Sequence, residues 1–188
     1  MRSAALVVIA LVVGMALSPA TVKADEPSAA GLWEQSDSKG HVGAWFLIFE
    51  HDGTYEGALA KTFPRPGDEP NPVCSKCSGD QQGQPLLGLT IIKGMERNGL
   101  AYENGSILDP RDGSVYQARM EVTPDGNKLK VRGYLGVSLL GRTQVWKRLP
   151  DNALARSEVP ANLMPFWDAV FSASSSKSKM ATSETPKS

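Results

Sequence analysis

The sequence predicts an all-β protein: a small antiparallel, up-and-down β-barrel of about eight strands, followed by a C-terminal helix. Short segments of alternating or continuous apolar residues follow one another. Turn signals of the Asp-Gly and Asn-Gly type separate them at intervals of roughly 8–12 residues. This succession is typical of a barrel or a sandwich rather than a βαβ fold. Closure into an up-and-down barrel would remove the exposed edges of an open meander.

The first 24 residues are predicted to be a cleavable signal peptide. Arg2 precedes an apolar run over residues 4–17, and Val22 and Ala24 supply the small residues that a signal peptidase recognises. The alternative, a membrane anchor, needs about 20 apolar residues, and this run is shorter. We therefore expect cleavage after Ala24 and a periplasmic or secreted mature protein with no integral membrane segment.

The mature chain is expected to form one domain. The predicted barrel covers residues 25–150, a linker and amphipathic helix cover 151–171, and a disordered tail covers 172–188. The leader carries two of the 20 basic residues, so 18 remain against 20 acidic ones and the net charge is about −2. Because such a chain offers no basic field, we expect no nucleic-acid partner.

The first strands are predicted from aromatic and β-branched residues around a tight turn. Gly31 to Trp33 opens the first strand, and residues 42–49 form the second. Asp52 and Gly53 between two apolar runs are a strong hairpin signal, so residues 54–60 are expected to return antiparallel.

A long ordered loop is predicted over residues 63–84, since proline cannot donate to a sheet ladder. It contains Cys74 and Cys77, which in an exported protein are most simply one structural disulfide. The alternative is a thiol-redox enzyme, but no helical pattern follows the pair to lower a thiol pKa. With His41 and His51 as the only histidines, we predict no metal site and no cofactor.

Five further strands complete the predicted barrel. Residues 115–122 alternate most regularly, and Asn104 with Gly105 could form a bulge in the preceding strand. The expected strand segments are residues 86–95, 100–108, 115–122 and 128–133, with a short apolar link at 137–140 and a last strand at 143–149.

After Pro150 the apolar spacing becomes helical. The residues with i, i+3, i+4, i+7 spacing are Leu163, Phe166, Trp167, Val170 and Phe171. We expect this helix to pack on the barrel. The alternative, a membrane-surface helix, would carry Lys and Arg on its polar side, which this segment lacks.

Aromatic residues occur on nearly every predicted strand. An eight-stranded barrel has room either for a filled core or for one small ligand. As candidate cavity lining we select the inward aromatics Trp45, Tyr55, Tyr116 and Trp146.

Seven short motifs resemble the DUF2147 family of exported bacterial proteins, whose function is unknown. They are Cys74 to Cys77, Pro85 to Leu89, Ile91 to Met95, Asn104 to Pro110, Gly113 to Tyr116, Leu129 to Tyr134 and Gly141 to Arg148. The resemblance covers about residues 31–150, although the Cys-x-x-Cys loop is similar only to a subset of the family.

The resemblance implies a lipocalin-like barrel. In lipocalins a Gly-x-Trp motif on the first strand packs against an arginine from the last strand and closes one end. Gly31 and Trp33 match that motif, and Arg142 or Arg148 would be the partner by cation–π contact. These four residues would be structural, and the proline loop departs from typical lipocalins, so no ligand identity carries over.

Three functions therefore remain open. The first is a non-enzymatic protein that binds a small, hydrophobic or amphipathic ligand in a barrel cavity. The second is an envelope interaction or stress scaffold with a filled barrel. The third is a thiol-redox enzyme that uses Cys74 and Cys77. We expect the first and predict no enzymatic activity; the oligomeric state does not follow from the sequence.

Overall fold

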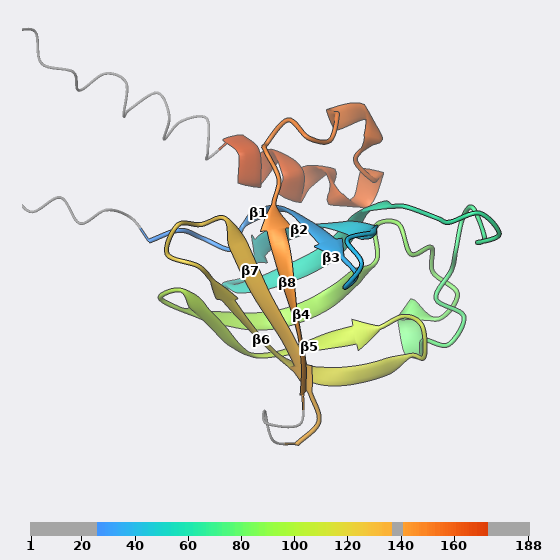
Figure 1. The fold of residues 1–188 in the computed structure, drawn as a ribbon, viewed down its shortest axis with the longest axis horizontal. Coiled ribbons are helices and arrows are strands. Elements are labelled where there is room, and N and C mark those ends of the chain that lie inside the picture. The colour runs from blue at the N-terminus through green and yellow to red at the C-terminus, as the bar shows by residue number, and fades with distance from the viewer. Residues whose placement is uncertain (1–25, 137–140, 173–188) are drawn as a thin grey trace, which may run out of the picture.

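Eight antiparallel strands form a closed barrel in which each strand pairs with its neighbours in sequence. The computed structural model describes residues 26–136 and 141–172 (Figure 1), so the predicted signal peptide and residues 173–188 lie outside it. The strands are β1 (Gly31–Ser36), β2 (Val42–His51), β3 (Thr54–Thr62), β4 (Thr90–Asn98), β5 (Ala101–Asp109), β6 (Ser114–Val122), β7 (Lys128–Tyr134) and β8 (Gly141–Arg148). The predicted all-β, up-and-down barrel is thus confirmed.

Local sequence rules account for the hairpins. Asp52 and Gly53 both adopt positive φ, 50° and 78°, which matches the tight turn predicted between β2 and β3. On β6 the predicted alternation is confirmed, because Ala118, Met120 and Val122 are buried while the residues between them are not. Closure follows where β1 meets β8, with Trp33 opposite Arg148 in the ladder.

The ladder departs from regularity at two places. Asn104, with a φ of 63°, interrupts the pairing of β5 with β6 between Tyr102 and Gly105, as the predicted bulge requires. Strand β4 begins at Thr90 rather than at residue 86. Leu89 instead turns back on β3, since its carbonyl accepts from the Leu59 N–H at 3.0 Å.

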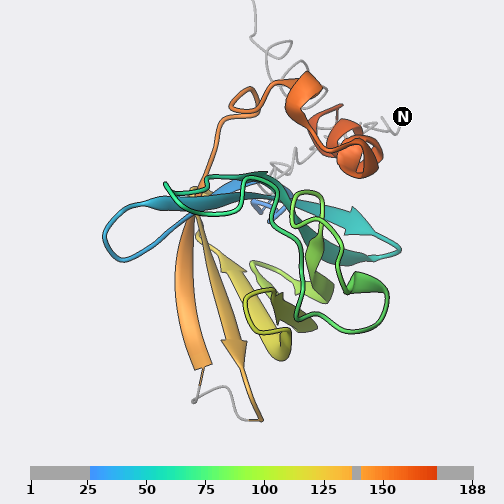
Figure 2. The same ribbon diagram turned by 90° about the vertical axis from the view of Figure 1, so that its right-hand side faces the viewer.

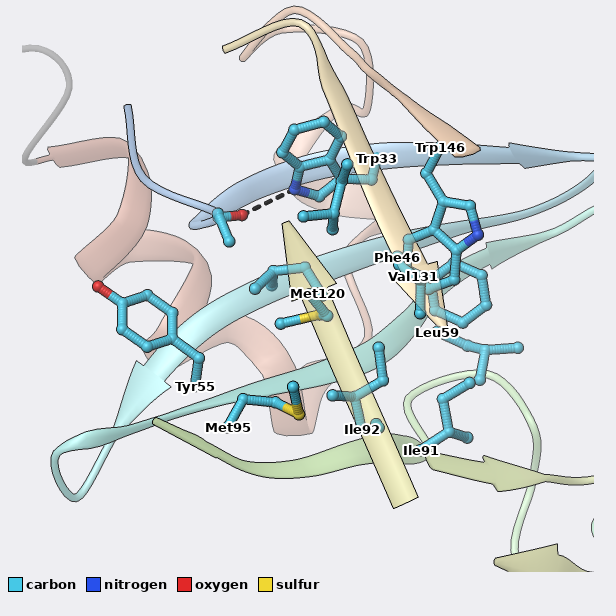
Figure 3. Packing of buried hydrophobic residues seen from close by; sticks show 14 of the residues in the cluster. Trp33, Phe46, Tyr55, Leu59, Ile91, Ile92, Met95, Met120, Val131 and Trp146 are labelled. Carbon is cyan, nitrogen blue, oxygen red and sulfur yellow. Dashed lines mark hydrogen bonds between the residues drawn. The ribbon is translucent and has the colours of Figure 1, made fainter. Parts of the chain in front are cut away.

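One end of the barrel interior is filled with large side chains (Figure 3). Trp33, Tyr55, Met95, Tyr102 and Met120 are all buried in one continuous cluster. The rings of Tyr55 and Tyr102 meet edge to face, 4.8 Å apart. These side chains pack against one another at the end of the barrel that is called the closed end below.

A second apolar cluster lies outside the barrel, where the C-terminal segment covers β1, β2 and β3 (Figure 2). This segment contains the short helical turns η3 (Arg156–Glu158) and η4 (Ala161–Leu163), followed by a helix whose described part spans residues 164–172. Leu163 and Trp167 from the segment are buried against Leu47 and Phe49 of β2. The predicted helical periodicity therefore serves packing on the barrel.

Candidate functional site

A cavity of about 700 Å³ occupies the barrel end opposite the filled one. Its lining comes from the inner faces of the strands and from the β5–β6 turn. The principal lining residues are Gln35, Ala44, Phe46, Leu59, Ile91, Ile107, Asp109, Arg111, Tyr116, Val131, Gly133, Tyr134, Arg142, Gln144 and Trp146. This volume falls within the usual range of small-molecule sites, about 300–1,000 Å³.

The floor of the cavity is a pair of stacked aromatic rings. Phe46 of β2 and Trp146 of β8 lie 4.3 Å apart between ring centroids, with 11° between their planes. The Trp146 indole Nε1 donates to Oε1 of Gln144 at 3.0 Å, which fixes the orientation of the ring. In Figure 3 this pair lies on the right, with Met120 between it and Tyr55, and both of its residues also line the cavity.

Alternate residues of β8 form a column along the barrel wall. Because successive side chains point to opposite faces, Arg142 and Gln144 line the cavity on the same face as Trp146. Gly133 of β7 is paired with Arg142 and adds no side chain to the interior. The wall therefore changes from aromatic at the floor to amide and then guanidinium at the mouth.

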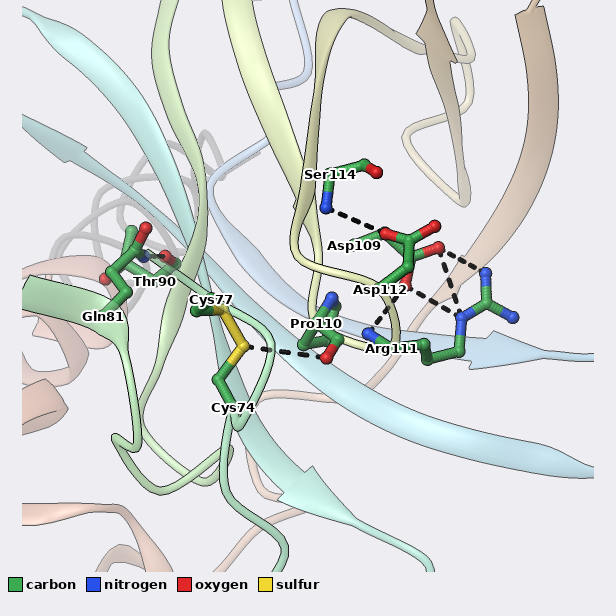
Figure 4. Close-up of a disulfide and its surroundings, with 9 residues drawn as sticks. All are labelled: Cys74, Cys77, Gln81, Thr90, Asp109, Pro110, Arg111, Asp112 and Ser114. Atoms are coloured by element: carbon green, nitrogen blue, oxygen red, sulfur yellow. Dashed lines mark hydrogen bonds and ion pairs between the residues drawn. A yellow bond between two sulfur atoms is a disulfide. The ribbon is translucent and has the colours of Figure 1, made fainter. Parts of the chain in front are cut away.

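An ion pair sits at the rim, in the turn between β5 and β6. Arg111 Nε lies 2.8 Å from Oδ1 of Asp109 and its Nη2 lies 2.5 Å from Oδ2 (Figure 4). These hydrogen bonds lower the pKa of Asp109, and Arg142 adds a smaller electrostatic effect in the same direction. The Asp112 carboxylate accepts the Ser114 N–H, which fixes the turn.

The proline-rich loop contains a disulfide that lies against the same turn. Cys74 and Cys77 form the predicted bond, with Cα atoms 5.4 Å apart, and both are buried in the interior cluster. Cys74 Sγ lies 3.7 Å from the carbonyl oxygen of Pro110, a cavity-lining residue (Figure 4). The short helical turn η1 (Gly79–Gln81) follows, and Gln81 Nε2 donates to the Thr90 carbonyl at 2.9 Å. The loop thus supports one side of the cavity rim.

Replacing both cysteines by alanine is expected to reduce the free energy of unfolding by at most about 2 kcal/mol, because a cross-link between residues three apart closes only a short loop in the unfolded chain. A urea titration of the double variant against wild type measures this loss. Lys76→Ala, an exposed change in the same loop, is the matched control and should leave the midpoint almost unchanged. Equal stability of the double variant and wild type would show that the loop holds its place without the bond.

The closed end is fixed by Trp33 and Arg148. The guanidinium carbon of Arg148 lies 4.1 Å from the Trp33 ring centroid. Arg148 also donates to the carbonyls of Ser28, Ala30 and Gly126, and burial lowers the pKa of its guanidinium. A Cβ on Gly31, whose φ is 139°, would collide with the same guanidinium. Of the two predicted arginine partners, Arg148 takes this position and Arg142 lines the cavity.

The four aromatic residues selected from the sequence do not form one group. Tyr116 and Trp146 line the cavity. Tyr55 points inward but packs in the filled end. The prediction for Trp45 is wrong, because its indole lies on the outer face with the C-terminal segment and meets Phe63 edge to face at 5.3 Å.

Sequence reasoning did not select Phe46, Gln144 or Arg142 as cavity residues. The signal that could have found two of them is the alternation of β8, which puts Arg142 and Gln144 on the face of Trp146. Phe46 lies in a run that is apolar on both faces, so alternation could not distinguish it from Trp45.

The described residues contain neither a metal-binding cluster nor a membrane-spanning helix. Across residues 26–136 and 141–172, no three His, Cys, Asp or Glu side chains gather in a way that could hold a metal ion. Within the same ranges, no helix has the length and apolar character needed to cross a membrane.

Comparison with known proteins agrees with this architecture. A solved structure of protein HP1028 from the human pathogen Helicobacter pylori, described as belonging to the lipocalin family, superposes with a TM-score of 0.60 at 17% identity. The match covers 71% of this chain and 91% of that one, and at this identity it shows the fold alone. No curated protein matches the chain. The model of a family of uncharacterized proteins conserved in bacteria, DUF2147, matches residues 31–148, and the chain therefore belongs to the DUF2147 family.

Proposed function

We propose that the protein is a non-enzymatic binding protein that holds a small, partly apolar ligand in the barrel cavity. The observation that carries this proposal is the cavity of about 700 Å³ above the Phe46–Trp146 stack. An aromatic floor with apolar walls gains roughly 25 cal/mol for each Å² of apolar ligand surface removed from water. A few polar groups near the mouth would orient the ligand, which is the usual composition of such sites.

The proposal also places the mature protein in the periplasm or outside the cell. The leader over residues 1–24 and the Cys74–Cys77 disulfide support this location, because such bonds persist in oxidising compartments. Mass spectrometry of the protein recovered from a periplasmic extract tests it. A mature chain that begins at Asp25 is the expected result, and recovery of the intact leader in the cytoplasmic fraction would refute it.

Fluorescence titration with amphiphiles and small metabolites tests ligand binding directly. The chain has four tryptophans, and Trp146 is the one in the cavity lining. A bound ligand should change the emission of wild type, and the change should be lost in Trp146→Phe and kept in Trp167→Phe, whose indole packs outside the barrel. No response to any ligand class would contradict the proposal.

Filling the cavity should weaken ligand binding without unfolding the barrel. Ala44 lines the cavity, so Ala44→Phe would occupy ligand space and weaken binding at least about tenfold, which corresponds to roughly 1.4 kcal/mol. Isothermal titration with a ligand found in the fluorescence screen measures this. Val145→Phe on the exposed face of β8 is the control and should bind as wild type does. Unchanged affinity in a folded Ala44→Phe variant would place the ligand elsewhere.

A further inference from the structure

We infer that the ligand of this cavity is an amphiphile with an anionic head group, a carboxylate or a phosphate, which Arg142 binds at the mouth while the apolar part rests on the Phe46–Trp146 floor. The inference rests on the proposed function and specifies its ligand class. Two observations carry it. Polar and apolar side chains lie on different sides of the cavity, and the charged groups at its rim differ in whether they already have a hydrogen-bond or ion-pair partner.

Apart from the charged turn between β5 and β6 at the rim, the Arg and Gln side chains that line the cavity lie on one wall. Arg142 and Gln144 lie on β8, and Gln35 lies on β1, which pairs with β8 and closes the barrel. The wall formed by β3, β4 and β5 contributes apolar Leu59 and Ile91, with Ile107. An occupant that satisfies both walls must itself have a polar and an apolar part, because a buried polar group without a partner is costly.

The charged side chains at the mouth differ in whether they already have a partner within the protein. Arg111 makes a two-point contact with Asp109, and Asp112 accepts the Ser114 N–H. Arg142 feels Asp109 electrostatically, yet within the part of the chain that the structure describes no hydrogen bond or ion pair joins its guanidinium to another residue. Within those described ranges the Arg142 guanidinium therefore lines the cavity with its donors unused, and the carboxylate it acts on electrostatically, Asp109, is already paired with Arg111.

Guanidinium matches the geometry of carboxylate and phosphate oxygens and binds them through charge-assisted hydrogen bonds. Gln144 stands between Arg142 and Trp146 on the same face of β8, so a head group at Arg142 would leave the chain below it pointing at the floor. A cationic head group would instead meet Arg142 directly and be repelled.

The test compares four probes with the same alkyl chain on the full mature protein: dodecanoate, dodecyl phosphate, dodecanol and dodecyltrimethylammonium. The three charged probes are used below their micelle concentrations and dodecanol below its solubility limit. Isothermal titration should show one or both anions binding about tenfold more tightly than dodecanol, and the cation binding most weakly. The ratio of carboxylate to phosphate affinity tells which head group the site takes. Arg142 is exposed at the mouth, so the advantage of the anions should shrink as salt is raised.

Arg142→Gln should remove the preference for anions and leave dodecanol binding unchanged. Arg119→Gln is the matched control, since Arg119 is exposed on β6, pairs with Glu103 and does not line the cavity. Equal binding of dodecanoate, dodecyl phosphate and dodecanol by wild type, or a preserved anion preference in Arg142→Gln, would overturn this inference and leave the proposed function standing. Failure of all four probes to bind would overturn both.

Discussion

Trp33→Ala is expected to lower the free energy of unfolding by about 3–5 kcal/mol, the usual range for removing a large aromatic side chain from a core. For a domain of this size the melting temperature should fall by roughly 10–20 °C. Circular dichroism in a thermal melt, together with urea unfolding, measures both quantities.

The size of this effect follows from how much the Trp33 side chain supports. It is fully buried, its Nε1 donates to the Ala29 carbonyl at 2.7 Å, and Arg148 stacks on its ring. The Ala29 N–H in turn donates to the hydroxyl of Tyr102 at 2.8 Å. Removing the indole leaves a cavity and also strips Arg148 of the surface that compensates for its burial.

Trp45→Ala is the matched control for this prediction. The two indoles have the same volume, but Trp45 is only half-buried on the outer face and donates to Glu34 at 3.3 Å. We expect Trp45→Ala to lower the free energy of unfolding clearly less than Trp33→Ala does. Equal destabilisation by the two substitutions would mean that the closed end of the barrel contributes no more than a surface contact.

Local signals in the sequence were sufficient for most of the fold. Asp-Gly pairs indicate the tight turns. In a half-buried strand such as β6, apolar and polar residues alternate because one face of the strand meets water. A sheet of antiparallel strands joined by short turns has two unpaired edge strands, and closure into a barrel pairs them with each other. The lipocalin resemblance also indicated an arginine partner for Trp33 but left Arg142 and Arg148 open, and the structure shows that the partner is Arg148.

The facing of Trp45 could not be predicted for a physical reason. Strand β2 is buried on both sides, because Phe46 and Ile48 face the barrel interior while Leu47 and Phe49 face the C-terminal segment. A strand covered on both faces reads as a continuous apolar run, so its sequence carries no period that distinguishes inside from outside. The side of the sheet on which Trp45 lies could be predicted only with the knowledge that the C-terminal segment packs on the outer face of β2.

Whether the barrel is hollow depends on quantities that sequence does not display. Inward positions near the mouth carry small residues such as Ala44 and Gly133, whereas those at the closed end carry Tyr55 and Tyr102. The level of each side chain along the barrel axis is set by strand tilt and register, which emerge only on closure. Tyr55 was therefore correctly expected to face inward but not to lie in the filled half.

Ending the chain at Pro150 is expected to have the second large effect, because the outer face of β1, β2 and β3 would lose its cover. Leu32, Leu47 and Phe49 are at most 1% exposed in the intact protein, and they would meet water directly. Leu163 and Trp167 cover them, and the loss of each buried side chain would remove roughly 1.5–3 kcal/mol of stabilising free energy. The truncated protein should bind a hydrophobic dye strongly, melt at a much lower temperature and self-associate in sedimentation experiments.

A chain that ends after Ser172 is the control, because it retains all the buried residues that the C-terminal segment contributes to the outer cluster. It should melt and sediment as the full mature protein does. The point variant Leu163→Ala, expected to cost about 2–5 kcal/mol, tests the same packing without removing the Asn162 contact to Gly88. A protein ending at Pro150 that stays monomeric with an unchanged melting temperature would show that the barrel stands alone. The segment would then be free to leave the surface of β2, and its apolar face would be available to another partner.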